Sequence, residues 1–403
     1  MKYLKILNNL KGLLITYWYP PKNSIAAHRV HSFTEYLNNQ SDSLDVLCPD
    51  WEGDLELQNK SRIFFSHKIK SIDIQEEEKY NKSIKGWLVK NILYKYFKYN
   101  LFRDSKPGLF YKNAVKALDK INFNEYDYIL TSYNPLDSLH IGNYIKSKHP
   151  HLKWVIDYRD LYSLMEYNKL GILKGYFKKI EKKITLNADA FITVSKTLLK
   201  DQSNFLNLKS ELIYNGYNNT PYKKDISFLK DTVNNNLPII SYTGSFYNGE
   251  RDLSPFISYW KENKLNQKFN LIIAYPFLED KKYLDSIKIS EINNCFTYHN
   301  LNFNQSKSLQ EVSEILLLVA NNNKKGNGFL TGKIFEYIDS EKPILYAGYT
   351  KNYELYDLII ENQLGEHYTK FDFTNYKKIS IVKPKQFSRE TQAKKLQCFI
   401  KKL

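Results

Sequence analysis

Short apolar runs alternate with amphipathic helical segments along most of the chain. The predicted strands of a first series cover residues 13–20, 44–49, 126–133, 154–158, 190–195 and 212–216. Those of a second series cover residues 238–245, 270–276, 295–301, 314–320 and 343–348. Most runs are β-branched or aromatic and are bounded by Gly, Pro, Asn or Asp, which is typical of buried parallel strands. The pattern predicts an α/β protein whose parallel sheets carry helices on both faces.

The alternation is interrupted by residues 217–238, which are rich in Asn, Lys and Pro and have no strand pattern. A complete series of strands and helices lies on each side, so we expect two doubly wound domains of similar size. The predicted organisation is a Rossmann-like N-terminal domain over 1–216, a linker over 217–237, a Rossmann-like C-terminal domain over 238–385 and a final helix over 386–403.

The composition excludes several classes of protein. Hydrophobic residues make up 42% of the 403 residues and charged residues 25%, as in ordinary globular chains. Apolar runs such as 315–320 are far shorter than the ~20 residues of a membrane-spanning helix. Cys48, Cys295 and Cys398 are far apart and odd in number, which argues against a disulfide framework and a zinc site. We therefore expect a cytoplasmic protein without a metal.

The net charge is +16, and nearly all of the basic residues are lysines. Such a charge attracts phosphates, nucleic acid and anionic membranes, although a lysine-rich composition is also typical of AT-rich codon usage. Only six of the 59 basic residues are arginine. Because arginine recognises anions through two parallel hydrogen bonds, Arg29, Arg159 and Arg251, which lie in the motifs below, are candidate binding residues.

Four predicted strand ends carry residues suited to binding, because ligands of open α/β sheets bind outside the carboxyl ends of the strands. After the first strand, a loop with Asn23 and Ser24 runs into a helix that carries Arg29. The free N–H groups at the start of such a helix suit an anion. The alternative is that Pro20 and Pro21 simply end the strand.

The strand over 154–158 delivers Arg159 and Asp160 to its end. Charges at the end of a buried strand are costly unless they are paired or used. The two residues are therefore either a structural ion pair or functional groups.

In the C-terminal half, Gly244 and Ser245 follow a strand, and Arg251 comes soon after them. A glycine turn of this kind lets the backbone approach a ligand closely. The alternative is a tight turn at Asn248-Gly249 with an exposed tip at Glu250 and Arg251.

The fourth strand end is followed by the glycine-rich loop 326–332. Thr331 is placed to cap the next helix, and Lys333 and Glu336 lie three apart on one face of it. A lysine at a helix start suits phosphate, and Glu336 can accept two hydrogen bonds from ribose hydroxyls. The alternative is an ordinary surface ion pair. A Walker A loop is excluded by the glycine spacing and by Ile334.

Taken in order, these pieces resemble the retaining glycosyltransferases of family 4, of the bacterial surface-polysaccharide type. The resemblance covers about residues 13–348 and includes the segments YWYPPKNSIAAHR, WVIDYRDLYS, ISYTGSFYNGERD and TGKIFEYIDSEKPIL. It implies the GT-B fold, in which two Rossmann-like, doubly wound domains face a central cleft. It also implies a C-terminal helix that crosses back to the N-terminal domain.

The resemblance implies roles for individual residues. Those implied in donor binding are Gly244, Ser245, Arg251, Thr331, Gly332, Lys333 and Glu336. Arg251 and Lys333 would hold the donor diphosphate, and Glu336 would bind the ribose. Those implied in catalysis are Asp160, Arg159, Arg251 and Lys333. Those implied on the acceptor side are Asn23, Ser24 and Arg29.

Two positions depart from the family pattern. Gly328 stands where the first glutamate of the family's Glu-x7-Glu motif is expected. Contacts with the donor sugar must therefore differ or come from backbone amides of the loop. The glycine pair usual in the first loop is replaced by residues 23–26, which changes the contacts expected with the acceptor.

The implied activity is transfer of a sugar from a UDP- or GDP-linked donor to a glycan or polyprenyl-diphosphate-linked acceptor, with retention of the anomeric configuration. Arg251 and Lys333 would neutralise the leaving diphosphate, and Asp160 would orient the acceptor or the sugar. We expect no metal and no cofactor besides the nucleotide-sugar, since the chain has no Asp-x-Asp motif. The implied setting is the synthesis of capsule, exopolysaccharide or O-antigen.

Two basic segments in the N-terminal half favour peripheral contact with the inner face of an anionic membrane. One is a helix predicted over 173–186, and the other covers residues 82–106. The lysines opposite the apolar face of the helix are Lys174, Lys178, Lys179, Lys182 and Lys183. The alternative is a lysine-rich helix exposed to solvent.

Three other interpretations stay open. A nucleotide-sugar epimerase shares the fold but needs catalytic carboxylates and histidines that cannot be placed in this sequence. A non-catalytic sugar-binding partner with the GT-B fold is compatible with Gly328. A nucleic-acid-binding protein would use the positive charge. The chain has no recognition motif, however, and its basic residues are spread out, so we expect no nucleic-acid partner.

Overall fold

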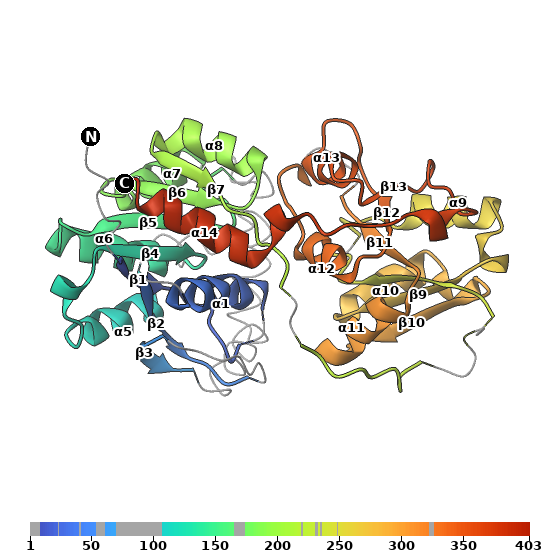
Figure 1. Ribbon diagram of the computed structural model, residues 1–403, viewed down its shortest axis with the longest axis horizontal. Coiled ribbons are helices and arrows are strands. Elements are labelled where there is room, and N and C mark those ends of the chain that lie inside the picture. Colours follow the sequence, from blue (N-terminus) through green and yellow to red (C-terminus); the bar gives the residue numbers. More distant parts are fainter. Residues whose placement is uncertain are drawn as a thin grey trace, which may run out of the picture. The chain divides into compact units, whose positions relative to one another are not determined.

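The computed structural model describes residues 9–22, 24–39, 42–53, 61–69, 107–164, 174–218, 221–229, 233, 236–247, 249–321 and 326–403. The chain divides into two compact units (Figure 1). The N-terminal unit comprises Met1–Asn215 and Arg389–Leu403, and the C-terminal unit comprises Gly216–Ser388.

The N-terminal unit is built on a parallel seven-stranded sheet with the order β3-β2-β1-β4-β5-β6-β7. The strands are β1 (Lys11–Ile15), β2 (Ser43–Asp50), β3 (Ile63–Lys68), β4 (Tyr128–Tyr133), β5 (Lys153–Tyr158), β6 (Ala190–Thr193) and β7 (Lys209–Leu212). The described helices are α1 (Ile25–Asn38), α5 (Leu109–Leu118), α6 (Asp137–Lys148), α7 (Lys174–Ile184), α8 (Lys196–Leu206), α14 (Arg389–Ile400) and the short 3-10 helix η2 (Phe123–Glu125).

Both faces of the central strands of this sheet are buried, which is why those strands are mostly apolar, whereas the edge strands β3 and β7 are partly exposed. Leu13 and Ile15 of β1 belong to the core formed with α5, α6 and α7, whereas Leu14 belongs to the core formed with α1 and α14. Helix α14 packs along α1 (Figure 1), and Tyr214 N donates to Gln392 Oε1 at 2.7 Å. The last helix of the chain is thus part of the N-terminal unit.

The C-terminal unit is built on a parallel six-stranded sheet with the order β10-β9-β8-β11-β12-β13. The strands are β8 (Ile239–Thr243), β9 (Asn270–Tyr275), β10 (Cys295–His299), β11 (Ile315–Val319), β12 (Ile344–Ala347) and β13 (Gly365–His367). The described helices are α9 (Ser254–Glu262), α10 (Leu278–Ser286), α11 (Phe303–Val312), α12 (Gly332–Ser340) and α13 (Glu354–Glu361). The 3-10 helices are η4 (Leu265–Gln267), η5 (Ile289–Glu291), η7 (Tyr376–Lys378) and η8 (Lys385–Phe387).

The described part of residues 217–237, predicted as a linker, packs on the C-terminal sheet. Phe228 and Leu229 contact the core on one face of that sheet, and the Tyr222 hydroxyl donates to Glu311 Oε2 at 2.7 Å. The structure thus places this segment inside the C-terminal unit, which begins at Gly216.

Each sheet has a point at which the strand order reverses. It lies between β1 and β4 in the N-terminal unit and between β8 and β11 in the C-terminal unit. At such a point the connections leave toward opposite faces, and the crevice outside the carboxyl ends of the two strands is where α/β sheets bind their ligands. The predicted α/β class with two parallel, doubly wound sheets is confirmed.

Candidate functional site

The glycine turn after β8 is fixed by a carboxylate from α10. Ser245 Oγ and Phe246 N donate to Asp280 Oδ1 at 3.0 and 2.8 Å. Gly244 crosses the ring of Tyr242, where a Cβ atom would come within 3.0 Å of the hydroxyl oxygen. The turn therefore needs glycine for its close approach to this ring and aspartate to hold its backbone.

The side chain of Arg251, which follows this turn, reaches back toward the end of β8. Its Nη1 donates to Ser245 O at 3.3 Å, and its guanidinium lies 4.7 Å from the centroid of the Tyr247 ring. The Tyr242 hydroxyl donates to the same carbonyl at 2.8 Å. Arg251 is only partly exposed, so it is not the exposed tip of a tight turn.

Helix α12 brings a lysine and a glutamate to the same region. Thr331 caps the helix, as predicted, and its Oγ1 accepts from Lys333 N at 3.4 Å. Lys333 Nζ donates to Glu336 Oε2 at 2.8 Å, with 24% and 34% of the two side chains exposed. A pair of the same spacing in this unit, Lys288 and Glu291, is 3.6 Å apart and 69% and 62% exposed. Lys333 and Glu336 thus form a closer and more buried pair than the surface pair does.

A residue that the sequence pattern does not indicate, Gln310 of α11, ties Glu336 to the sheet. Buried Gln310 donates from Nε2 to Glu336 Oε2 at 3.2 Å and to Thr243 Oγ1 of β8 at 3.1 Å. Both donors that reach Glu336 therefore bind Oε2. No side chain in the described ranges binds the other oxygen, Oε1, which is left to accept from a ligand.

The electrostatics of this cluster suit an anion beside a hydroxyl donor. Burial alone would raise the pKa of Glu336, but Lys333, Lys307 and the hydrogen bonds lower it to about 2, so the carboxylate is ionised at neutral pH. Burial raises the pKa of Tyr242, while Arg251 and Lys333 both oppose that rise. Two cations from different elements therefore both act electrostatically on the same hydroxyl group at the end of β8.

The backbone explains the glycine at position 328. Gly328 has φ +89°, in a region that residues with side chains rarely adopt, and its carbonyl accepts from Leu330 N at 3.1 Å. A glutamate at this position would strain the turn. The loop conformation thus favours glycine at position 328.

In the N-terminal unit, Arg29 is a buried brace with 1% of its surface exposed. Its Nε and Nη2 donate to Asp157 at the end of β5, with 2.8 Å between Nη2 and Oδ1. Its Nη1 donates to the carbonyls of Ile213 and Tyr214, each at 2.9 Å. These contacts use most of the guanidinium N–H groups, and they join α1, β5 and the segment after β7.

Arg159 and Asp160 lie at the end of β5, and both are partly exposed. Arg159 Nε donates to Tyr133 O at 3.1 Å, and no carboxylate in the described part of the chain forms an ion pair with it. Burial raises the pKa of Asp160, against the effect of Arg159. The structural ion pair considered from the sequence is thus not formed.

Of the two other residues predicted on the acceptor side, the structure describes one, Ser24. Ser24 caps α1, and its Oγ accepts from Ala27 N at 3.1 Å. Asn23 and the basic segment 82–106 lie outside the described residues. None of the described helices is both long and apolar enough to cross a membrane, and the described residues include no group of three or more His, Cys, Asp or Glu arranged to hold a metal ion.

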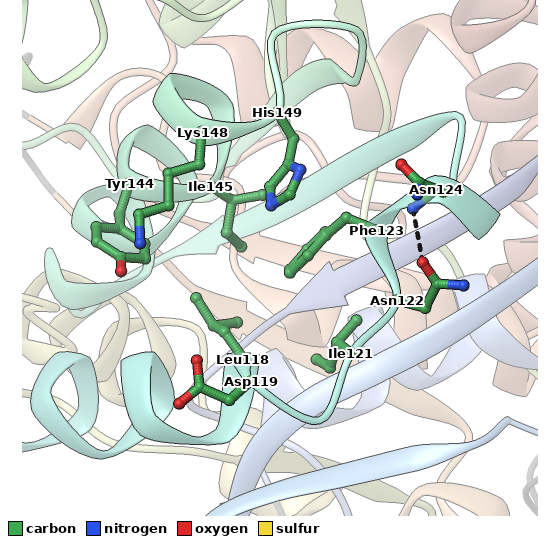
Figure 2. Close-up of a pocket in the computed structure, with 10 residues that line it drawn as sticks. All are labelled: Leu118, Asp119, Ile121, Asn122, Phe123, Asn124, Tyr144, Ile145, Lys148 and His149. Carbon is green, nitrogen blue, oxygen red and sulfur yellow. Dashed lines mark hydrogen bonds between the residues drawn. The ribbon is translucent and has the colours of Figure 1, made fainter.

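A hollow of about 260 Å³ opens between η2 and the carboxyl ends of α5 and α6 (Figure 2). Phe123 stacks on His149 with ring centroids 4.4 Å apart, and Lys148 Nζ lies 4.5 Å from the centroid of the Tyr144 ring. Because η2 precedes β4, the hollow lies at the amino ends of the strands. No predicted site residue lines it.

No protein-family model matches this chain, and no curated protein matches it. Solved structures are nevertheless similar over nearly its whole length. The N-terminal domain of trehalose-6-phosphate phosphatase from Candida albicans has a TM-score of 0.62 and 10% identity, covering 98% of this chain and 97% of its own. The catalytic domain of starch synthase IV from Arabidopsis thaliana, bound to ADP and acarbose, has a TM-score of 0.59 and 11% identity, with 98% and 99% covered. The fold is GT-B.

A further GT-B structure shows the same likeness. The trehalose-6-phosphate structure from E. coli bound with UDP-2-fluoro glucose has a TM-score of 0.56 and 11% identity, covering 98% of this chain and 99% of its own. The predicted GT-B fold with two Rossmann-like domains is thus confirmed. At such low identity the likeness establishes the fold and leaves the activity to be argued from the residues.

Proposed function

We propose that this GT-B protein is a glycosyltransferase. It would bind a nucleoside diphosphate sugar in its C-terminal unit and pass the sugar to a glycan or polyprenyl-diphosphate-linked acceptor bound by its N-terminal unit. The observation that carries the proposal is the cluster of Arg251, Lys333 and Glu336 where the order of the C-terminal sheet reverses. Structures of the same fold hold UDP-2-fluoro glucose and ADP, which supports it.

The cluster matches the parts of a nucleoside diphosphate. Its diphosphate would lie against Arg251 and Lys333, and the attraction between these charges would be stronger there than in bulk water. The free Oε1 of Glu336 would accept from a ribose hydroxyl, with Lys333 and Gln310 holding the carboxylate in place through Oε2.

The two cations would also serve the chemical step. As the bond between the anomeric carbon and the diphosphate oxygen breaks, negative charge grows on that oxygen, and fixed cations stabilise it. In the retaining reaction that the family resemblance implies, the acceptor oxygen bonds to the same face of the sugar, and the departing oxygen takes the acceptor proton. The proposal needs no metal and no further cofactor.

In the N-terminal unit we propose Asp160 as the group that orients the acceptor or the sugar, with Arg159 beside it. Arg29 would act as a positioning residue, since it fixes the end of β5 through Asp157 and is itself buried. Ser24 would act by holding the start of α1.

Thermal unfolding with free UDP, GDP, dTDP and ADP tests the donor site. We expect UDP or GDP to stabilise the protein, by ~2.7 kcal/mol at 100 times its dissociation constant. Because Glu336 would bind the ribose, the 2′-deoxy form of that nucleotide is expected to bind about tenfold more weakly, and Glu336→Ala, which removes the hydrogen-bonding group, should remove the difference. Glu291→Ala, in the exposed pair of the same spacing, is the matched control. Equal binding of the two forms, or no shift with any nucleotide, would contradict the proposal.

We also propose that α7 contacts the anionic inner face of the cytoplasmic membrane. Its lysines Lys174, Lys179, Lys182 and Lys183 are exposed, and Tyr176 is 51% exposed beside them. Lysines near an anionic leaflet contribute ~1 kcal/mol each. The apolar side of the helix faces the core through Phe177 and Ile184, so the exposed side is the basic one.

Sedimentation with lipid vesicles tests this contact. We expect the protein to bind vesicles that contain phosphatidylglycerol and not pure phosphatidylcholine, with binding lost in high salt. Lys179→Glu with Lys183→Glu should weaken binding by about tenfold or more, whereas Lys281→Glu with Lys282→Glu on α10 should leave it unchanged. Equal loss in both double variants would point to overall charge and not to α7.

A further inference from the structure

An aromatic stack joins two loops at the carboxyl edge of the N-terminal sheet. Trp18 follows β1 and Trp51 follows β2, and their rings stack with centroids 5.1 Å apart and planes 15° apart. Trp51 Nε1 donates to Tyr17 O at 2.6 Å. Gly53 packs so closely on the other loop that a Cβ atom would come within 2.2 Å of Pro21 O. The two loops are therefore in direct contact.

The two indoles differ in how exposed the ring is and in whether the N–H group is hydrogen-bonded. Trp51 is 8% exposed, and its N–H group is used within the protein. Trp18 is partly exposed, and its Nε1–H is neither buried nor bonded to any described residue. By contrast, Trp154 donates to Thr131 Oγ1. A partly exposed indole with a spare N–H group can offer a ligand both an apolar face and a hydrogen-bond donor.

A cation stands beside this stack. Lys22 Nζ lies 5.3 Å from the centroid of the Trp51 ring, and no described carboxylate lies within ion-pair distance of it. Its ammonium group thus lies at the aromatic surface with no counter-ion among the residues that the structure describes. A ligand on the stack would therefore be favoured if it carried a negative charge.

The location is where this sheet is expected to bind a ligand. The order of the strands reverses between β1 and β4, and Trp18 lies in the loop that leaves β1 at this point. The loop continues to Ser24 and α1, so the stack belongs to the side of the molecule predicted to meet the acceptor.

We propose that the stack formed by Trp18 and Trp51 is a platform for a pyranose ring of the acceptor, and that Lys22 binds a phosphate attached to that sugar. This inference rests on the proposed glycosyltransferase function, and it names the acceptor class as a phosphorylated hexose end. The C–H groups on one face of a pyranose complement the electron-rich face of an indole. The free N–H of Trp18 would donate to a hydroxyl of the sugar.

Saturation-transfer NMR on the full chain tests the platform with α-D-glucose 1-phosphate, α-D-galactose 1-phosphate, the two methyl glycosides and inorganic phosphate. At least one hexose 1-phosphate is expected to show saturation transfer to its ring protons. It should bind more tightly than its methyl glycoside or phosphate alone. Trp18→Ala should weaken it by about tenfold, and Trp18→Phe by much less. Lys22→Ala should lower the affinity for the hexose 1-phosphate to that for the methyl glycoside.

Two further variants complete the test. Phe277→Ala removes a 53% exposed ring from the C-terminal unit and should leave hexose 1-phosphate binding unchanged. Trp18→Leu fills a similar space without an aromatic face, so it gives the same readout if Trp18→Ala does not fold.

The nucleotide shift is measured on the same samples to separate the two proposals. A protein that binds nucleotide but no hexose 1-phosphate, or whose Trp18 variants bind it as the native protein does, overturns the platform. Binding of hexose 1-phosphate that depends on Trp18, in a protein that no nucleotide stabilises, keeps the platform and overturns the donor site.

Discussion

Replacing Arg29 with methionine is expected to lower the free energy of unfolding by about 3–5 kcal/mol. Asp157, whose side chain is fully buried, would lose the cation that it contacts at 2.8 Å. Among the described side chains it would keep one hydrogen-bond donor, the neutral Ser132 Oγ at 3.3 Å. The carbonyls of Ile213 and Tyr214 would lose donors as well. Urea unfolding followed by circular dichroism measures the change.

Two variants make the interpretation specific. Arg62 pairs with Asp45 at 3.0 Å, but its side chain is 51% exposed, so Arg62→Met is expected to cost at most about 1 kcal/mol. Adding Asp157→Leu to Arg29→Met removes the unpaired buried charge and is expected to recover most of the lost stability. A cost for Arg29→Met as small as that of Arg62→Met would show that the guanidinium is not the brace described above.

The fold class could be predicted because strands buried on both faces leave continuous apolar runs in the sequence. β3 could not, since it is an edge strand in which every residue is partly or fully exposed, and β13 is only three residues long. The first strand is predicted too long: β1 ends at Ile15, and the aromatic residues after it form a loop. Those rings are partly buried by Trp51 of another loop, a contact that no local pattern reveals.

The candidate site could be predicted from the sequence only where its parts are close together in the chain. The spacing of Lys333 and Glu336 places them on one helical face, and the structure confirms the pair. Their partner Gln310 has no distinguishing neighbours, because its role depends on how α11 packs against β8 and α12. Arg29 stood out because arginine is rare in this chain, yet its partner Asp157 is 128 positions away, so its burial could not be foreseen.

Replacing Lys333 with alanine is expected to lower the rate of nucleoside diphosphate release from the sugar donor by about 10²- to 10³-fold. The ammonium group would no longer oppose the charge that grows on the leaving oxygen. Lys333 and Lys307 together stabilise the ionised form of Glu336. Without Lys333, this negative charge would repel the incoming phosphates more strongly. The variant should therefore show a higher KM for the donor as well as a lower kcat, measured by release of UDP or GDP.

The control for this variant is Lys288→Ala, which breaks the exposed pair of identical spacing and should leave the rate unchanged. Lys333→Arg keeps the charge and should retain more activity than alanine does, whereas Arg251→Ala should resemble Lys333→Ala because both cations act electrostatically on the Tyr242 hydroxyl. Asp160→Asn belongs to the other unit and is expected to slow transfer while leaving the thermal shift by free nucleotide intact. If Lys333→Ala released nucleotide at the native rate, Lys333 would not stabilise the leaving group, and Arg251 alone would have to carry that charge.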